Sequence, residues 1–293
     1  MIIVTLVATL SAAMVWRQWR AVQVESAERA RVQAAWMLSG ALELAKLVLR
    51  EDKKQYTALT EPWATPLAEA RLSTFLAVDK ANADDGPEAF LSGNITDAQA
   101  RYNLNNLITK EGKLDPAERA VLERLCLAVG IETGIADRIA TKLLEAKLAS
   151  SASAPLLPSN VAQLTWLGVD AAAVQALTPY VVLLPMETTL NVNTASAEVL
   201  AAVIKDMTTA DAARLVEFRK REPFKDLKAF ERQLPAFTGD PAKIGVLSSF
   251  FEVRGRMRLV DRVLVERSLL QRQGLKFRMW DRERISSLEQ VGG

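Results

Sequence analysis

The sequence predicts an α+β fold with three parts: a long N-terminal helix that spans a membrane at its start, a small antiparallel sheet, and a large all-helical domain inserted in that sheet. Three observations support this prediction. An uncharged apolar run at the N-terminus continues without a helix breaker into an amphipathic segment. The middle of the chain reads as short helices with capping residues. Alternating apolar and polar residues on both sides of this middle part indicate strands.

The N-terminal helix is expected over residues 1–55, with a transmembrane part at residues 1–20. Residues 1–16 carry no charged side chain, and no glycine precedes Gly40 and no proline precedes Pro62. Nothing therefore forces the backbone out of a helix. We expect one continuous helix that is apolar at its start and amphipathic further along.

Between Arg17 and Arg50, apolar side chains recur at three- and four-residue steps and form one stripe on an otherwise polar rod. Small residues toward the membrane end would let neighbouring helices approach closely. We interpret the stripe as a contact for partner helices, where an introduced glutamate should abolish association and leave the rest of the chain folded. The residues assigned to this contact are Ala27, Ala30, Ala34, Leu38 and Leu42.

Two other interpretations of the apolar start are open. A secretory signal peptide would need a basic region before the apolar run and a cleavage site after it, whereas the helical pattern here continues past Arg17. The second is a plain single-span anchor, although sixteen residues at about 1.5 Å each reach about 24 Å, less than the roughly 30 Å hydrocarbon core. Either the span includes the interface at Trp16 to Trp19, or the reading frame begins slightly upstream with a short basic leader.

The composition narrows the chemistry. The 293 residues include no histidine and one cysteine, Cys126. The absence of histidine excludes Ser/His/Asp and Cys/His catalysis and the common histidine-based metal sites. The leucines around Cys126 indicate that its thiol lies in the core. With 37 basic and 35 acidic residues, the chain has no concentrated basic character of the kind that nucleic-acid binders show. These features favour a non-enzymatic protein that acts through contacts with other proteins.

The first part of the sheet is expected in residues 56–104. Residues 89–99 read as a strand with a bend at Gly93 and Asn94. Residues 70–80 fit either a short strand or a turn of helix, and residues 82–88 are a turn by composition.

The second part of the sheet is expected in residues 248–293, where apolar and polar residues alternate again. Three strands are predicted, with turns at residues 260–261 and 273–274, and Gly255 lies where a bulge would fall. We expect the strands before and after the helical part to belong to one sheet, so that the helices form an insertion.

The insertion is expected over residues 105–247 as an all-helical unit. Asp115 followed by Pro116 predicts the cap and first turn of a helix that ends near Val129. A small-residue linker follows at residues 149–159. Further helices are expected at residues 134–147, 161–164 and 170–177, after a cap at Asn193 or Thr194, and at residues 209–221.

The chain contains two Asn-x-Asn pairs, Asn103 with Asn105 in DAQARYNLNNL at the start of the insertion and Asn191 with Asn193 in LNVNTASAEVL within it. Asparagine side chains can hold neighbouring backbone groups and cap the next helix. Two caps would explain the asparagines but not the order of long apolar helix, strand, helical insertion and final sheet. That order, with these two segments, resembles the general secretion pathway protein K family, the minor pseudopilins K of type II secretion systems.

The resemblance implies a pseudopilin fold and a position at the tip of a periplasmic pseudopilus, where the protein initiates or caps assembly for export across the outer membrane. It implies the minor pseudopilins I and J as partners, and further contacts with the major pseudopilin, the secretion pore or substrates. The protein would cross the inner membrane once, with most of the chain in the periplasm. Family members lack the fifth-position glutamate of major pilins, and here Thr5 stands fifth and Glu25 is the first acidic residue.

The resemblance also implies that calcium can bind, although no cofactor is required. Four acidic residues lie near the expected sheet: Asp84, Asp85, Glu88 and Asp97. They match no EF-hand spacing, and we interpret them as solvated loop carboxylates. No metal ligands are assigned.

A membrane-anchored helix-hairpin-helix DNA-binding protein of the competence type is the alternative. The segment from Leu190 to Phe230 resembles the helix-hairpin-helix domains of competence DNA receptors, in which a glycine-rich hairpin brings backbone N–H groups close to a phosphate. At the hairpin this sequence reads Ile204 to Thr208, with no glycine and with Asp206 beside the supposed phosphate site. We therefore expect a packing scaffold and no nucleic-acid partner.

Overall fold

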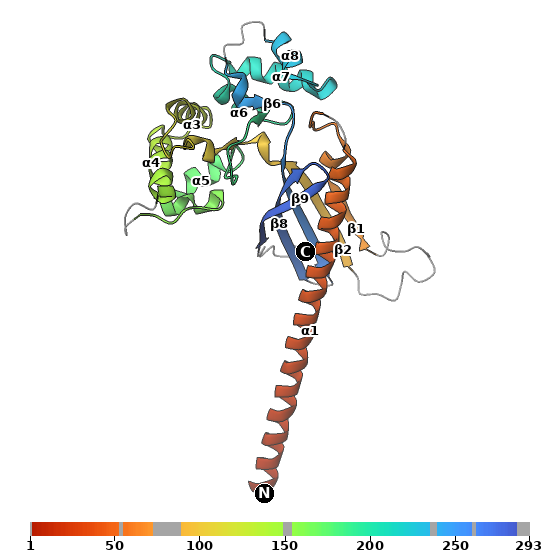
Figure 1. The fold of residues 1–293 in the computed structure, drawn as a ribbon. Coiled ribbons are helices and arrows are strands. Elements are labelled where there is room, and N and C mark those ends of the chain that lie inside the picture. The colour runs from red at the N-terminus through yellow and green to blue at the C-terminus, as the bar shows by residue number, and fades with distance from the viewer. Residues whose placement is uncertain are drawn as a thin grey trace.

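The computed structural model describes residues 2–52, 55–72, 89–148, 154–234, 239–259 and 262–285. Figure 1 shows three parts along one axis: a bare helical rod at the N-terminus, a sheet beside the upper half of the rod, and a group of short helices at the end remote from the N-terminus. The rod is α1 (Ile2–Glu51), one continuous helix of 50 residues. The prediction of a single long helix is confirmed.

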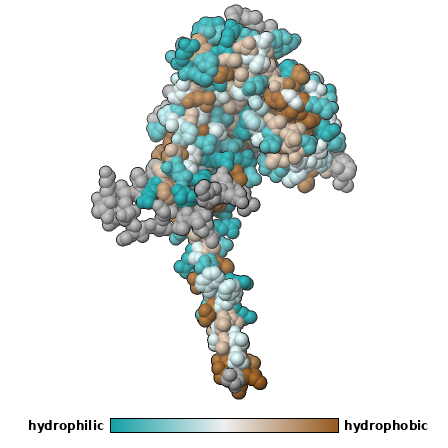
Figure 2. Space-filling model, turned by 180° about the vertical axis from the view of Figure 1, so that it is seen from behind, coloured by the Kyte–Doolittle hydropathy of each residue, from teal (hydrophilic) through white to brown (hydrophobic). Residues whose placement is uncertain are grey.

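The first half of α1 has no protein around it. Every described residue up to Ser26 is exposed, and Figure 2 shows apolar side chains at the tip of the rod. By length and composition, α1 could cross a membrane. Trp16 and Trp19 lie side by side with ring centroids 5.5 Å apart, which suits the membrane–water interface where tryptophan is enriched.

The sheet has five strands in the order β1-β2-β7-β8-β9, and all neighbouring strands are antiparallel. Because β2 pairs with β7 along its whole length, the strands before and after the insertion belong to one sheet, as predicted. The strands are β1 (Leu67–Arg71), β2 (Ala89–Asp97), β7 (Phe250–Leu259), β8 (Arg262–Gln273) and β9 (Lys276–Ile285).

The pairing of β2 with β7 places Gly93 opposite Gly255 and continues in register on both sides. The expected bulge at Gly255 is therefore wrong. Glycine serves a different purpose here, because a Cβ on Gly255 would lie 2.9 Å from Cδ2 of Leu38 in α1. The missing side chain lets the helix approach the sheet closely.

The buried stripe of α1 packs on this sheet in three successive groups. Ala34 and Leu38 share a cluster with β2 and β7, Leu42 and Ala45 share one with β7 and β8, and Leu49 packs with Trp63 and Phe251 at the top. Burial of each leucine contributes about 1.5–3 kcal/mol. The stripe thus holds the sheet on the helix.

The helical part has one core of its own, which includes Cys126 and residues from α3 through α8. Burial raises the pKa of the Cys126 thiol to about 11, in agreement with a core role. Asp115 caps α3 by accepting from two backbone N–H groups, as predicted. The helices are α3 (Pro116–Ala128), α4 (Gly134–Leu148), α5 (Ala171–Leu177), α6 (Ala197–Val203), α7 (Thr209–Arg221) and α8 (Leu227–Arg232).

Two details of this part differ from the expectation. The cap of α6 is Ser196 and not Asn193 or Thr194. The region is also not entirely helical, because two short parallel pairs cross it, β3 (Tyr102–Asn103) with β4 (Val181–Val182) and β5 (Leu190–Asn191) with β6 (Ile244–Gly245). The first pair joins the start of the insertion to its middle, and the second joins the middle to the end. The predicted turns at residues 82–88 and 260–261 lie outside the described residues, as does part of the linker, residues 149–153.

Candidate functional site

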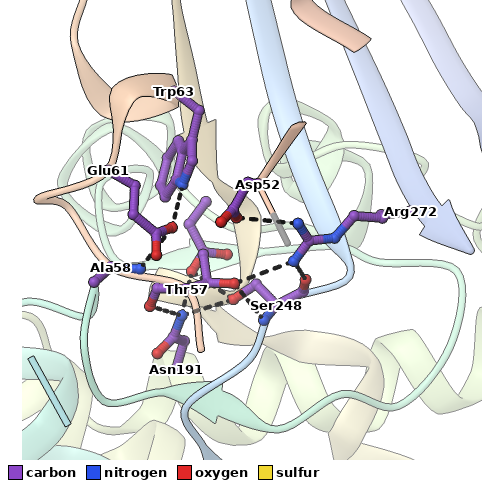
Figure 3. A network of polar contacts seen from close by, with 9 residues as sticks. Asp52, Thr57, Ala58, Glu61, Trp63, Asn191, Ser248 and Arg272 are labelled. Carbon is purple, nitrogen blue, oxygen red and sulfur yellow. Dashed lines mark hydrogen bonds and ion pairs between the residues drawn. The ribbon is translucent and has the colours of Figure 1, made fainter. Parts of the chain in front are cut away.

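A buried polar network lies where the sheet meets the helical part (Figure 3). Its centre is Asp97, the last residue of β2, with 3% of its surface exposed. Its Oδ2 accepts hydrogen bonds from Ser248 Oγ at 2.6 Å, Thr194 Oγ1 at 2.6 Å and Asn191 Nδ2 at 2.9 Å. Its Oδ1 accepts from the backbone N–H of Gln99 at 2.8 Å. One carboxyl therefore joins the end of β2 to the Asn191–Thr194 segment of the insertion and to Ser248 just before β7.

Burial raises the pKa of Asp97 above its ordinary value, and the four hydrogen bonds lower it only in part. A shifted pKa in a buried acid can mark a catalytic group, but structural networks shift pKa values as well. Here each oxygen of Asp97 is engaged by the protein itself, and the side chain is closed to solvent. The arrangement suits a structural hub.

The end of α1 is tied to the same network through Arg272 of β8. Its guanidinium pairs with Asp52 at 3.2 Å and donates to the carbonyl of Ser248 at 3.0 Å and to Thr57 Oγ1 at 3.3 Å. The Thr57 carbonyl in turn accepts from Asn191 Nδ2 at 3.0 Å. The insertion is consequently attached both to α1 and to the sheet.

Glu61 closes the network on the side of the loop that follows α1. Its Oε2 accepts from Trp63 Nε1 at 2.7 Å and from the N–H of Ala58 at 3.3 Å. The Trp63 ring meets the Phe251 ring edge-on, with centroids 5.4 Å apart. Sequence reasoning missed Thr57, Glu61, Ser248 and Arg272, and singled out Asp97 for another role.

The four asparagines of the two pairs all lie at connections within the insertion or at its base. Asn103 accepts from the N–H groups of Asn105 and Leu184, each at 3.1 Å. Asn193 binds both backbone groups of Phe224, each at 2.8 Å. Of the other two, Asn191 belongs to the network above, and Asn105 Oδ1 accepts from Lys147 Nζ at 2.9 Å.

The structure gives the predicted partner stripe a different role. Ala34, Leu38 and Leu42 are at most 6% exposed, because the chain's own sheet covers them. The assignment of these three to a partner helix is therefore corrected: they face inward. Ala27 and Ala30 are half-buried, and a partner contact through them stays a prediction.

A second set of apolar side chains lies on the opposite, exposed face of α1. Trp36 is 73% exposed and Val32 is 51% exposed, and Leu44 and Leu47 are 47% exposed each. The signal for this face was present in the sequence, since a tryptophan on a polar helix face is unusual. It was overlooked because the alanine and leucine stripe is more regular.

The acidic residues considered for calcium are not brought together by the described structure. Asp97 belongs to the buried network, so its interpretation as a solvated carboxylate is wrong. Asp84, Asp85 and Glu88 lie outside the described residues. Within the part of the chain that the structure describes, no group of three or more acidic, histidine or cysteine side chains could hold a metal ion.

The helix-hairpin-helix segment forms as α6 and α7 with a short connection. Asp206 in this connection has φ of 61°, and it is the one non-glycine residue with positive φ in the described part of the chain. Glycine adopts this conformation freely and aspartate tolerates it. The connection thus forms the tight turn of a hairpin, but it presents the exposed carboxylate of Asp206 where a phosphate would approach.

The buried Arg219 of α7 shows what these helices do instead. It donates to the carbonyl oxygens of Val192 and Ala195, and burial lowers its pKa to about 10. A cation turned inward to hold the loop before α6 cannot contact DNA. Arg219 therefore contributes to the packing of this segment.

We expect residues 25–293 to show no salt-dependent retention of duplex DNA beyond the non-specific level, a Kd of about 10⁻⁴ M or weaker at physiological salt. The physical reason is the carboxylate of Asp206 at the hairpin. Fluorescence anisotropy across a salt series measures this directly. Micromolar binding that weakens steeply with salt and disappears in Lys205→Glu would favour the DNA-receptor class.

A long helix with a bare apolar start, laid on an antiparallel sheet and carrying a firmly attached helical insertion, defines a protein of pilin architecture. Comparisons with known proteins agree with this class. Residues 100–186 and 190–250 match two families that are each described as type II secretion system (T2SS), protein K.

The chain is 31% identical to type II secretion system protein K of Pseudomonas aeruginosa, over 93% of this chain and 86% of the relative. It is 29% identical to the protein K of Klebsiella pneumoniae, over 94% of this chain and 91% of the relative. The chain belongs to the type II secretion system protein K family.

A solved structure shares the fold. It is a chain in the crystal structure of the GspK-GspI-GspJ complex from the enterotoxigenic Escherichia coli type 2 secretion system. The TM-score is 0.70 at 21% identity, and the match covers 89% of this chain and 99% of that chain. The predicted pseudopilin fold is confirmed by this likeness.

Proposed function

We propose that this chain is a non-enzymatic minor pseudopilin that initiates or caps the periplasmic pseudopilus at its tip and assembles there with pseudopilins I and J. The observation that carries the proposal is the position of the helical insertion. It lies above the sheet and to one side of its upper end, at the end of the molecule remote from the N-terminus (Figure 1), and the Asp97 network holds it there.

The position of the insertion has a steric consequence for a filament. Pilin-type subunits associate through their long helices, so each subunit must leave room for another above it. The bulk of the insertion, which is expected over residues 105–247, occupies that space in this chain. Such a subunit can begin or end a fibre but cannot lie in its middle.

The partners are proposed from the related structure. GspK of enterotoxigenic Escherichia coli was crystallised in a complex with GspI and GspJ, and the present chain has the same fold over most of its length. Contacts with the major pseudopilin, the secretion pore or substrates would be additional.

Antibodies against the insertion offer a test of the tip position. In cells that assemble long pseudopili, gold-labelled antibodies against α3 and α4 should mark one end of each fibre in electron micrographs. Antibodies against the major pseudopilin should mark the full length in the same preparation. Insertion label distributed along the fibres would contradict the proposal.

The proposed location, an inner-membrane anchor with the bulk of the chain in the periplasm, makes a separate prediction. A reporter fused after Gly293 should be active only outside the cytoplasm, and deletion of residues 1–20 should release a soluble, folded remainder. The reason is that the first half of α1 makes no contact with the rest of the described structure. Activity of a cytoplasm-dependent reporter would contradict both the location and the tip role.

A further inference from the structure

A cavity with a volume of about 360 Å³ lies between α1 and the sheet. Its lining on α1 runs from Leu38 to Val48, a length of about 15 Å at about 1.5 Å per residue. The facing walls come from β2, β7, β8 and the loop of residues 62–67. Leu44 of α1 and Thr65 of the loop line the cavity and are exposed, so it opens to the surface between the helix and the loop.

Small residues on both sides leave this space open. Ala41 and Ala45 of α1 present one methyl group each. Gly93 and Gly255, which are cross-strand neighbours in β2 and β7, present no side chain. Most of the remaining wall is apolar and includes the ring of Trp63, which is 2% exposed. Protein interiors are normally packed to near crystal density, so an apolar space of this size suits an aliphatic ligand.

One carboxylate oxygen at the wall lacks a hydrogen-bond donor. Glu266 of β8 lies opposite Gly255, on the side of the sheet that faces α1, and is 4% exposed. Its Oε1 pairs with Arg282 Nε at 2.7 Å. Its Oε2 has no hydrogen-bond partner in the part of the chain that the structure describes, because Arg284 Nε is 3.8 Å away. A buried acceptor of this kind is costly, and a donor on a ligand would satisfy it.

The charges around Glu266 decide which donor fits. Two guanidinium groups, those of Arg282 and Arg284, already face this one carboxylate, so a cationic head group would add to an excess of positive charge. An anionic head group would meet the carboxylate of Glu266 itself. A neutral hydroxyl group donates a hydrogen bond to the charged oxygen and brings no further charge into an apolar space.

The position of the cavity limits the size of the ligand. Leu38 lies 19 residues beyond Trp19, about 28 Å at about 1.5 Å per residue, and Trp19 suits the membrane–water interface. The headgroup layer of a bilayer is far thinner than this distance. A lipid that remains in the membrane therefore cannot reach the cavity, and the ligand has to enter it as a whole molecule with a single chain.

We propose that this cavity binds a neutral single-chain amphiphile, an aliphatic chain that ends in a hydroxyl group, of the aliphatic alcohol or monoacylglycerol class. The chain lies between α1 and the sheet, and the hydroxyl group donates to Oε2 of Glu266. The bound ligand fills the space under α1 and stabilises the contact of the helix with the sheet. The site does not depend on the proposed function, because it lies within one chain.

Photolabelling of the full chain in lipid nanodiscs tests the site. The probe is a ten-carbon alcohol with a diazirine in its chain, and mass spectrometry of the digested protein identifies the labelled peptides. We expect saturable label in residues 38–48 and 62–67. 1-Decanol should compete at least about tenfold better than its isomer 1-methoxynonane, which has no O–H group, because a hydrogen bond to a charged acceptor is among the stronger ones.

The results that would overturn the proposal are equally specific. Label confined to residues 2–20 would show that the alcohol enters only the membrane. Equal competition by the two isomers would show that Glu266 does not bind the hydroxyl group. Absence of saturable label in residues 62–67 would leave water as the donor to Glu266.

A variant that fills the cavity provides a second measurement. Ala41→Phe places a ring in the cavity and should lower the label in residues 62–67 on the order of tenfold. Ala128→Phe, at the exposed end of α3, is the matched control and should leave this label unchanged. Unchanged label in a folded Ala41→Phe chain would contradict the site. If this variant unfolds, the competition between the two isomers in the wild-type chain still decides.

Discussion

Asp97→Ala should lower the free energy of unfolding by about 3–5 kcal/mol, because it removes the acceptor of several buried donors at once. The hydroxyls of Ser248 and Thr194, the amide of Asn191 and the N–H of Gln99 all point at this carboxyl. Some of these donors keep a second acceptor in the variant, as Asn191 Nδ2 keeps the carbonyl of Thr57. The loss is therefore smaller than the sum of four costs for unsatisfied buried donors. Urea unfolding of the full chain in detergent, followed by tryptophan fluorescence, measures it.

The matched control is Asp240→Ala. Asp240 is an exposed aspartate that accepts from one backbone N–H, that of Ala242, at 2.9 Å. Its removal should cost no more than about 1 kcal/mol, the usual value for a cap. Equal losses at Asp97 and Asp240 would show that the network does not hold the insertion, and the rigid attachment on which the capping role depends would have to be abandoned.

Leu38→Glu should destabilise the fold by at least about 4 kcal/mol, since it removes a packed leucine and buries an unpaired charge. Leu38 is 3% exposed and fits the space above Gly255. A glutamate there would separate α1 from β2 and β7, so thermal unfolding should begin with the sheet. This replaces the expectation from the sequence that such a change would act on association alone.

Leu47→Glu is the control on the outer face of α1, where the side chain is 47% exposed. A surface change of this kind is worth about 0.5 kcal/mol or less. A Leu38→Glu chain that unfolds at the wild-type temperature, but no longer binds its partners, would instead restore the original interpretation of the stripe.

Much of the local structure was predictable from the sequence. The absence of glycine and proline before Gly40 and Pro62 indicated one helix, and α1 runs from Ile2 to Glu51. Asp115 indicated the start of α3. The alternation in the final segment indicated three strands, which are β7, β8 and β9. In each case the signal is local, because helix breakers, caps and side-chain periodicity act within a few residues.

The candidate site was not predictable in the same way. The network residues come from five separate segments, and nothing in the sequence nearby shows that four of them are buried and the fifth, Arg272, is half-buried: Thr57, Asp97, Asn191, Ser248 and Arg272. Asp97 read as a solvated carboxylate because an acidic residue is exposed in most proteins. Only the meeting of the sheet with the insertion surrounds it with donors.

Three features follow from the amino-acid sequence alone: the apolar stripe on the shaft of α1, the N-terminal segment suited to a membrane, and the helical insertion between the two halves of the sheet. What covers the stripe depends on the tertiary fold. The hydrophobic effect depends on the apolar area removed from water and not on the identity of the surface that removes it. Ala34, Leu38 and Leu42 would therefore look the same in sequence under a partner helix or under the chain's own sheet, and the fold places them under the sheet.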